Sequence, residues 1–322
     1  MTSRRVRWAL ALAIAVCAAC SDDPGGDPGA RERVADVVRA MAAAEPATIE
    51  IRLPYATADD LHQLSVGITP ERAALLEGAS LTLKNDFATN PLRAHFSAEL
   101  ATTAGRLEVR QIEDDLYLRA DVAELARVLD ESPRPFFRTL ARSKAFRPLL
   151  APALTGRWVH FYGVRDLGVA ASGDRGRGRS ERAAAALARA VEDGAAVTAE
   201  GRDSVGDRYR VDIDLRRFTE ALFEGLEGLV PVAPSPDELE AIPDERITLD
   251  VWIDDGLLRR IEADVSQLLA VARPGSGIER DPLIVRFDVT RFDPEGLRPP
   301  DAMVRVHAST FFQLLLAGRT GS

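Results

Sequence analysis

Histidines are the side chains best suited to metal binding or proton transfer in this sequence, which contains four of them: His62, His95, His160 and His307. Zinc and metalloprotease motifs place His or Cys ligands a few residues apart, and none of these histidines has such a partner. His160 alternates with Trp158 and Tyr162 along a predicted strand. It is either a polar group that lines a pocket or a histidine satisfied in the core or at the surface. The sequence therefore predicts no metal site and no cofactor.

Paired carboxylates are the second group that could do chemistry, because two neighbouring acids suit glycoside hydrolysis. The pairs Asp114-Asp115 and Asp254-Asp255 both fall at predicted hairpin turns, where Asp is favoured by turn geometry. The nucleophile motif G-x-S-x-G of α/β-hydrolases is absent from the sequence. We therefore expect that the protein is not an enzyme.

A Gly- and Arg-rich segment, Gly173 to Arg179, has some similarity to a phosphate-binding loop. It lacks the strand–turn–helix context and the Lys-Ser/Thr pair that such loops require. Residues 171–180 are therefore predicted to be a plain loop. Its arginines either contact lipid headgroups or keep the loop solvated.

The first nineteen residues have the pattern of a signal peptide. Arg4, Arg5 and Arg7 precede an unbroken apolar run from Ala9 to Ala19. That run is too short to span a bilayer, which needs about 20 apolar residues. It predicts a secretory signal peptide over residues 1–19.

The residues around Cys20 indicate how the exported chain is anchored. Ala18 and Ala19 stand directly before Cys20, and a polar tether rich in Gly and Pro follows it. This pattern resembles the bacterial lipobox, in which the Cys after small residues receives a diacylglycerol and becomes the mature N-terminus. Cys17 stands where the lipobox usually has Leu, and as an acceptor it would follow the bulky Val16. The resemblance implies lipidation of Cys20, and a plain secretory signal with an incidental Cys20 is the alternative.

Cysteine use and charge agree with an exported, lipid-anchored chain. Both cysteines lie in the signal region, so the body of the chain has no disulfides. The 322 residues carry 41 Lys+Arg and 50 Asp+Glu, a net charge of −9. Loss of residues 1–19 removes three Arg and no acid, which takes the charge to −12. An acidic protein binds neither nucleic acid nor anionic lipid by charge, so membrane attachment rests on the acyl chains.

Alternating apolar and polar residues dominate the body of the chain. Residues 20–30 are predicted to be a flexible tether and residues 31–322 a single domain. Ile247, Leu249, Val251 and Ile253 alternate up to Asp255-Gly256, a strong hairpin signal. About eleven such strands are expected, with five or six helices. Half-buried strands belong to antiparallel sheets. The predicted fold class is therefore α+β, a large curved antiparallel sheet, an unclosed half-barrel wrapped over helices.

Several helices are expected between the strands. Their predicted ranges are 31–44, 69–76, 121–130, 136–150, 181–191 and 215–229. Residues 231–243 are a Pro-rich connection. The short apolar stretch 309–317 is expected to pack as a final helix or to cover the mouth of a cavity.

Four phrases carry a resemblance to a known family. They are 114–121 (DDLYLRAD), 156–159 (GRWV), 207–211 (DRYRV) and 251–261 (VWIDDGLLRRI). Together with the order of elements over about residues 31–298, they make the chain similar to the LolA/LppX-type lipoproteins of actinobacteria, which include the LprG-like carriers. The resemblance implies a half-barrel of about eleven antiparallel strands over helices, with an apolar cavity for lipid acyl chains between them. Extra material near 164–195 and 231–245 leaves the size of that cavity open.

The function expected from these observations is a lipid-anchored envelope protein on the outer face of the cytoplasmic membrane. It would bind a lipid or glycolipid without catalysis. The side chains expected to line the cavity are Phe96, Val109, Leu118, Val211, Ile213, Leu249, Val251, Ile261, Val285 and Phe287. The alternative is that the same residues meet the helices in a closed core. The protein would then be an interaction or scaffold lipoprotein with an unknown protein partner.

Overall fold

The computed structural model describes most of the chain from Gly26 to Ser309. The described residues are 26–41, 47–64, 69–85, 95–113, 115–121, 156–163, 173–226, 235, 239–240, 242, 245–267, 282–301 and 304–309. Contacts within the chain define two compact units, each built from two stretches of sequence. Unit 1 comprises residues 1–44 and 175–289, and unit 2 comprises residues 45–174 and 290–322. The prediction treated residues 31–322 as a single domain.

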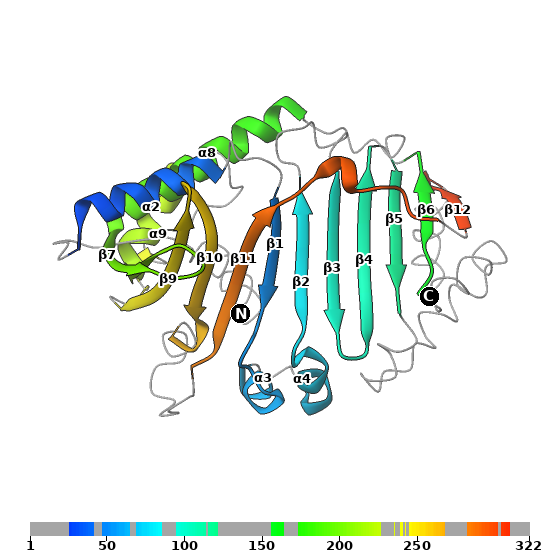
Figure 1. Cartoon of the computed structure of the whole chain (residues 1–322), viewed down its shortest axis with the longest axis horizontal. Helices are drawn as coiled ribbons and strands as arrows, with labels where there is room; N and C mark the ends of the chain where they lie inside the picture. The colour runs from blue at the N-terminus through cyan, green and yellow to red at the C-terminus, as the bar shows by residue number, and fades with distance from the viewer. Residues whose placement is uncertain are drawn as a thin grey trace. The chain divides into compact units, whose positions relative to one another are not determined.

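Unit 1 contains a five-stranded antiparallel sheet in the order β7-β8-β9-β10-β11 (Figure 1). Its strands are β7 (Ala195–Arg202), β8 (Asp207–Asp214), β9 (Arg246–Asp254), β10 (Leu257–Asp264) and β11 (Ile284–Arg291). The turn between β9 and β10 is the hairpin predicted from Asp255-Gly256. Both turn residues have positive φ, 52° and 71°, as a type I′ turn requires. This hairpin prediction is confirmed.

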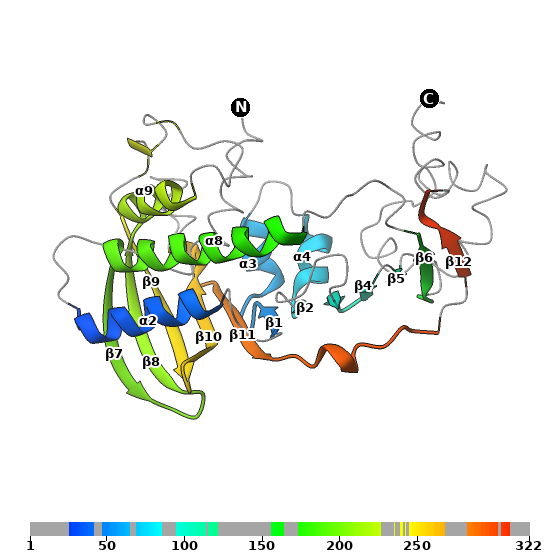
Figure 2. The same ribbon diagram turned by 90° about the horizontal axis from the view of Figure 1, so that it is seen from above.

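Among the described residues of unit 1, three helices pack on the sheet: α2 (Pro28–Met41), α8 (Gly173–Gly194) and α9 (Leu215–Gly225). Helix α2 contacts β7 and β10, and α9 contacts β8. Figure 2 shows α2 and α8 lying across these strands. Apolar side chains from helices and strands form one cluster with almost no exposure, among them Val34, Val191, Val197, Ile213, Phe218 and Ile247. Burial of one such side chain contributes about 1.5–3 kcal/mol.

Two boundaries in unit 1 differ from the expectation. Helix α8 begins at Gly173, so the loop predicted for residues 171–180 is wrong. Once the Ala-rich part of a helix is formed, each added residue gains a hydrogen bond at little cost, and Arg is a good helix former. Helix α2 begins at Pro28, three residues before the predicted helix start at residue 31, because Pro suits the first helical position.

Unit 2 contains a seven-stranded sheet in the order β12-β6-β5-β4-β3-β2-β1 (Figure 1). Its strands are β1 (Ala47–Arg52), β2 (Ser80–Asn85), β3 (Phe96–Thr102), β4 (Gly105–Ile112), β5 (Asp115–Ala120), β6 (Val159–Tyr162) and β12 (Val304–His307). Helices α3 (Ala58–Leu64) and α4 (Pro70–Leu76) lie between β1 and β2 in the sequence. The prediction of a helix over 69–76, with Pro in its first turn, is confirmed.

All strand pairs of unit 2 are antiparallel except β6 with β12, which is parallel. Parallel strands need a long connection, and here it runs from residue 163 to residue 303. The predicted fold class, α+β with a large, mainly antiparallel sheet that does not close, is confirmed. The parallel strand β12 was not predicted. A single-turn 3-10 helix, η2 (Pro294–Gly296), lies in the connection from β11 to β12.

Some expectations fall outside the described residues. These are the signal peptide with Cys20, the helices at 121–130 and 136–150, and most of the stretch 309–317. Within the described part of the chain, none of the helices has both the length and the apolarity needed to cross a membrane.

Candidate functional site

One face of the unit 2 sheet carries an apolar row that crosses all seven strands. Strand pairing places these residues opposite one another in the order Ile49, Leu83, Ala98, Val109, Leu118, Val159 and Val304. A second row beside it contains Ile51, Leu81, Leu100, Leu107 and Ala120. We call these twelve residues the apolar face. Six strand spacings of about 4.8 Å make it about 29 Å wide.

The apolar face is packed at one end and partly exposed in the middle. At the β6 end, Val159 and Phe161 are 3% and 6% exposed, and Leu118 and Val304 pack against them. Toward β2 and β3, Leu83, Ala98 and Leu100 keep part of their surface open. Leu107 is 38% exposed. Such a contiguous, partly exposed apolar surface is typical of a site that binds an apolar partner.

Three of the ten predicted lining residues lie on strands of unit 2. Val109 and Leu118 are neighbours in the seven-residue row. Phe96 projects from the same side of β3, opposite Gln111 of β4. All three side chains are partly exposed. The structure therefore brings these three to one face of one sheet.

The other seven predicted lining residues belong to unit 1. Val211, Ile213, Leu249, Val251 and Ile261 lie in its apolar cluster, none more than 6% exposed, and Phe287 packs against it. Val285 pairs with Ala263 of the same cluster. These side chains contact the helices and strands of unit 1. Contact of any of the ten residues with a ligand stays a prediction.

The opposite face of the unit 2 sheet is polar and held by ion pairs. Glu108, 2% exposed, receives hydrogen bonds of 2.7 Å from both Arg110 and Arg119. The same two guanidinium groups lie 4.7 and 4.9 Å from the ring centre of Trp158. Phe292 packs in the same region, in a cluster with Ile112, Tyr117 and Leu297. This arrangement positions the strands and leaves the carboxylate enclosed.

His160 also belongs to the polar face, and its hydrogen bonds are made within the protein. The ring stacks on Tyr117, with 4.5 Å between centroids. Its Nδ1 accepts a hydrogen bond of 3.1 Å from Arg305 Nε, and its Nε2 lies 3.0 Å from an Asp115 carboxylate oxygen. Burial, followed by the nearby Asp115 charge, raises the pKa of the Tyr117 hydroxyl. His160 is thus a buried histidine whose Nδ1 is hydrogen-bonded within the protein, while its Nε2, beside Asp115, makes no hydrogen bond.

Sequence reasoning missed that Arg305 and His307 would meet His160 and Tyr162. Arg305 lies 5.7 Å from the Tyr162 ring centre, and His307 meets Tyr162 edge-on at 5.1 Å. These contacts depend on the parallel pairing of β12 with β6. The alternation of Val304 and Val306 was the available signal, but it covers only four residues.

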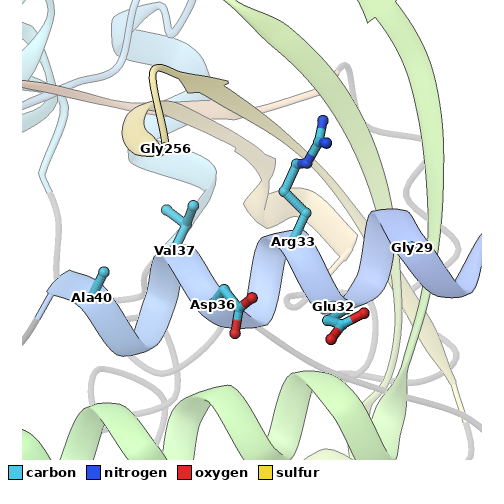
Figure 3. A pocket seen from close by; sticks show the side chains of 7 residues that line it. All are labelled: Gly29, Glu32, Arg33, Asp36, Val37, Ala40 and Gly256. Carbon is cyan, nitrogen blue, oxygen red and sulfur yellow. The ribbon is translucent and has the colours of Figure 1, made fainter.

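A hollow of about 420 Å³ lies beside α2 in unit 1 (Figure 3). Its lining consists of Gly29, Glu32, Arg33, Asp36, Val37, Ala40 and Gly256. Figure 3 shows Arg33, Val37 and Ala40 on the side of the Gly256 turn, with Glu32 and Asp36 pointing elsewhere. Arg33 donates a hydrogen bond of 3.1 Å to the Tyr209 hydroxyl. This bond raises the pKa of the Arg33 guanidinium. The Arg33 guanidinium on this side makes the hollow unsuited to an acyl chain.

Among the described residues, no group of three or more His, Cys, Asp and Glu side chains could hold a metal ion. The apolar face is therefore the feature of the described chain best suited to a ligand.

Comparison with known proteins found similarity only among solved structures. No protein-family model matches the chain, and no curated protein sequence matches it. The solved structures similar to it include LprF from Mycobacterium bovis, with 11% sequence identity and a TM-score of 0.36. The likeness covers 82% of this chain and 93% of that one. Similarity at this level says nothing of ligand or activity.

Proposed function

We propose that this protein is anchored by lipid in the cell envelope and binds a hydrophobic ligand, a lipid or glycolipid, without catalysing a reaction. The observation that supports it best is the seven-residue apolar row of unit 2. Its central members keep part of their surface exposed, although apolar strand residues of unit 1 such as Val211 and Ile213 are completely covered.

The dimensions of the apolar face suit acyl chains. It is about 29 Å wide, and the hydrocarbon of one membrane leaflet is half of a core about 30 Å thick. An acyl chain laid across the strands could therefore stay on the face over its length. Each buried CH₂ group contributes about 0.8 kcal/mol, so ten of them would give about 8 kcal/mol. That corresponds to a dissociation constant near 1 μM before the cost of association.

The anchor follows from the sequence around Cys20. A single acyl chain gives marginal membrane binding, whereas two anchor a protein stably. A diacylglyceryl group on Cys20 would hold the exported chain on the outer face of the cytoplasmic membrane. A ligand taken from that membrane would then be within reach of the protein.

A second candidate function is that of an interaction or scaffold lipoprotein. It is favoured by unit 1, where Val211, Ile213 and Leu249 are at most 2% exposed. These side chains already fill the space between sheet and helices. If unit 2 also carried no lipid, the protein would act through its surface on a protein partner.

Two neighbouring positions on β2 provide a matched test. Leu83 belongs to the apolar row, and Thr82 lies on the opposite face, paired with Glu50 and Glu99. Both side chains are partly exposed. Leu83→Lys should weaken binding of a fluorescent fatty acid about tenfold or more, because the buried area of the Leu is lost and a charge takes its place. Thr82→Lys should leave binding unchanged.

The native ligand is tested separately, by native mass spectrometry of protein purified from its own host followed by solvent extraction. The proposal predicts bound lipid in the wild-type protein and less in Leu83→Lys. A wild-type protein that never carries lipid, together with equal fatty-acid binding by both Lys variants, would contradict the carrier function. Recovery of a cross-linked protein partner from the same lipid-free preparation would then favour the scaffold function.

A further inference from the structure

The chain enters unit 1 along the outer edge of β7. The Asp27 backbone N–H donates a hydrogen bond of 2.8 Å to the carbonyl oxygen of Val197. Val197 lies in β7, which has β8 as its neighbour on the other side and ends the order of described strands. Asp27 therefore takes up part of the hydrogen-bonding capacity of a sheet edge.

Gly26 makes an even closer approach to the same edge. A Cβ atom at this position would lie 2.6 Å from the carbonyl oxygen of Val197 and 2.7 Å from its nitrogen. Both are backbone atoms of a paired strand and cannot move away at little cost. Only glycine fits at position 26 while the backbone keeps this path.

From Asp27 onward the chain is joined firmly to unit 1. The Asp27 carboxylate accepts a hydrogen bond of 2.9 Å from the Gly29 N–H in the first turn of α2, as an N-cap residue does. Ala30 and Val34 of α2 are buried in the core, 4% and 2% exposed. Arg31 reaches the Glu192 carbonyl oxygen of α8 at 3.3 Å. Gly26 and Asp27 thus form a joint that ties the N-terminal end of α2 to the outer edge of β7.

We propose that the outer edge of β7 is the side of unit 1 that faces the membrane, held there by the Gly26–Asp27 joint. The inference rests on the proposed lipidation of Cys20. Six residues from Cys20 to Gly26 span at most about 20–22 Å. The edge is therefore kept within that distance of the lipid headgroups.

The charged side chains near the β7–β8 turn and the neighbouring ends of β9 and β10 suit a headgroup surface. Glu200 pairs with Arg210 at 3.4 Å, and Arg202 pairs with Asp207 at 3.2 Å and with Asp254 at 2.5 Å. Arg259 lies 3.8 Å from the same Asp254. Three carboxylates are thereby matched by three guanidinium groups, whereas Asp203 in the same turn accepts hydrogen bonds from Trp252 and Val205. These ion pairs reduce the repulsion from an anionic headgroup surface, although the chain without residues 1–19 carries a charge of −12.

Single-cysteine labelling tests this orientation, because the body of the chain contains no cysteine. Ala199 lies exposed on β7, and Ala40 lies exposed near the far end of α2. Thirteen helical residues separate Ala40 from Asp27, about 20 Å along the axis, and α2 runs from β7 toward β10 (Figure 2). The lipidated protein, labelled at Ala199→Cys or Ala40→Cys, is reconstituted in phosphatidylcholine–phosphatidylglycerol vesicles that contain a headgroup-attached quencher. Quenching at position 199 should exceed quenching at position 40 several-fold.

The joint is tested by a matched pair of glycine variants in the same vesicles. Gly26→Ala should reduce the difference between the two labels, because the added methyl displaces the joint from Val197. Gly29→Ala should preserve it, since a Cβ there meets only Asp27 Oδ1 at an ordinary 3.4 Å. Equal quenching at both positions in a membrane-bound wild-type protein, or an unchanged difference in Gly26→Ala, would overturn the inference and leave the anchor intact. A protein that does not associate with vesicles at all would overturn both.

Discussion

The indole Nε1 of Trp252 donates a hydrogen bond of 2.8 Å to a carboxylate oxygen of Asp203, across the sheet of unit 1. The other Asp203 oxygen accepts from the Val205 N–H at 2.7 Å. Arg208 and Arg260 lie 5.3 and 5.8 Å from the centre of the Trp252 ring. The turn between β7 and β8 is thus tied to the C-terminal part of β9 through one carboxylate.

This carboxylate gives the protein a predictable response to acid. The Trp252 hydrogen bond and those from the backbone lower the pKa of Asp203 in the folded protein. The stabilisation is present above the pKa of Asp in the unfolded chain, about 3.9, and is lost as the pH falls through the lower folded pKa. In acid titrations followed by tryptophan fluorescence, Asp203→Asn should lose part of the pH dependence below about pH 4. An identical acid profile in the variant would contradict this role for Asp203.

Glu108 and Glu99 face each other on neighbouring strands of unit 2, and they provide a paired prediction about stability. Glu108→Gln leaves two partly buried guanidinium groups without their carboxylate and should lower the free energy of unfolding by about 1.5–3 kcal/mol. Glu99 is partly exposed and pairs with Arg106 at 3.3 Å. Glu99→Gln should cost less than about 1 kcal/mol. Urea denaturation of both variants checks the difference, and equal losses would contradict it.

Helices α8 and α9 meet where Gly225 lies against Ala186. A Cβ added at Gly225 would lie 2.5 Å from the Ala186 Cβ and 2.8 Å from its Cα. Gly225→Ala should therefore destabilise the protein by about 1–3 kcal/mol through overpacking, although Ala is the better helix former by about 1 kcal/mol. The double variant Gly225→Ala, Ala186→Gly should recover part of that loss. Thermal unfolding of the four proteins gives the coupling between the sites, and purely additive effects would exclude the close contact.

Local signals in the sequence were enough to predict much of the fold. The β9–β10 hairpin follows from Asp255-Gly256, because only a few residues tolerate the positive φ values of its turn. Strand β9 lies where Ile247, Leu249, Val251 and Ile253 were predicted to alternate along a strand. Such features depend on neighbours within one element and do not need tertiary contacts.

Features that depend on distant residues were missed. Arg305 and His160 are 145 positions apart in the chain. No local pattern predicts their contact or the parallel pairing of β12. The sequence also could not tell a covered strand from an open one. Leu83 and Leu249 both stand in alternating strands, yet Leu249 is 2% exposed and Leu83 keeps part of its surface open. The difference comes from packing, because the helices of unit 1 form a common core with Leu249.

The two cysteines of the chain allow a matched test of the lipid anchor, with Cys17 as the control for Cys20. Cys20 follows Ala18-Ala19 at the end of the apolar run, whereas Cys17 follows Val16. Cys20→Ser removes the thiol that would receive the diacylglycerol. The variant should appear in the soluble fraction or remain as an unprocessed precursor, because no second lipid signal replaces the two acyl chains.

Cys17→Ser keeps the small residues before Cys20 and should leave processing and membrane association unchanged. Both variants are followed by fractionation of the host cells and by the mass of the mature N-terminus. A processed Cys20→Ser protein that still fractionates with membranes would show that attachment does not depend on lipidation at Cys20. Loss of attachment in Cys17→Ser alone would place the lipid on Cys17, which would lengthen the chain to Gly26 by three residues, about 10 Å at full extension.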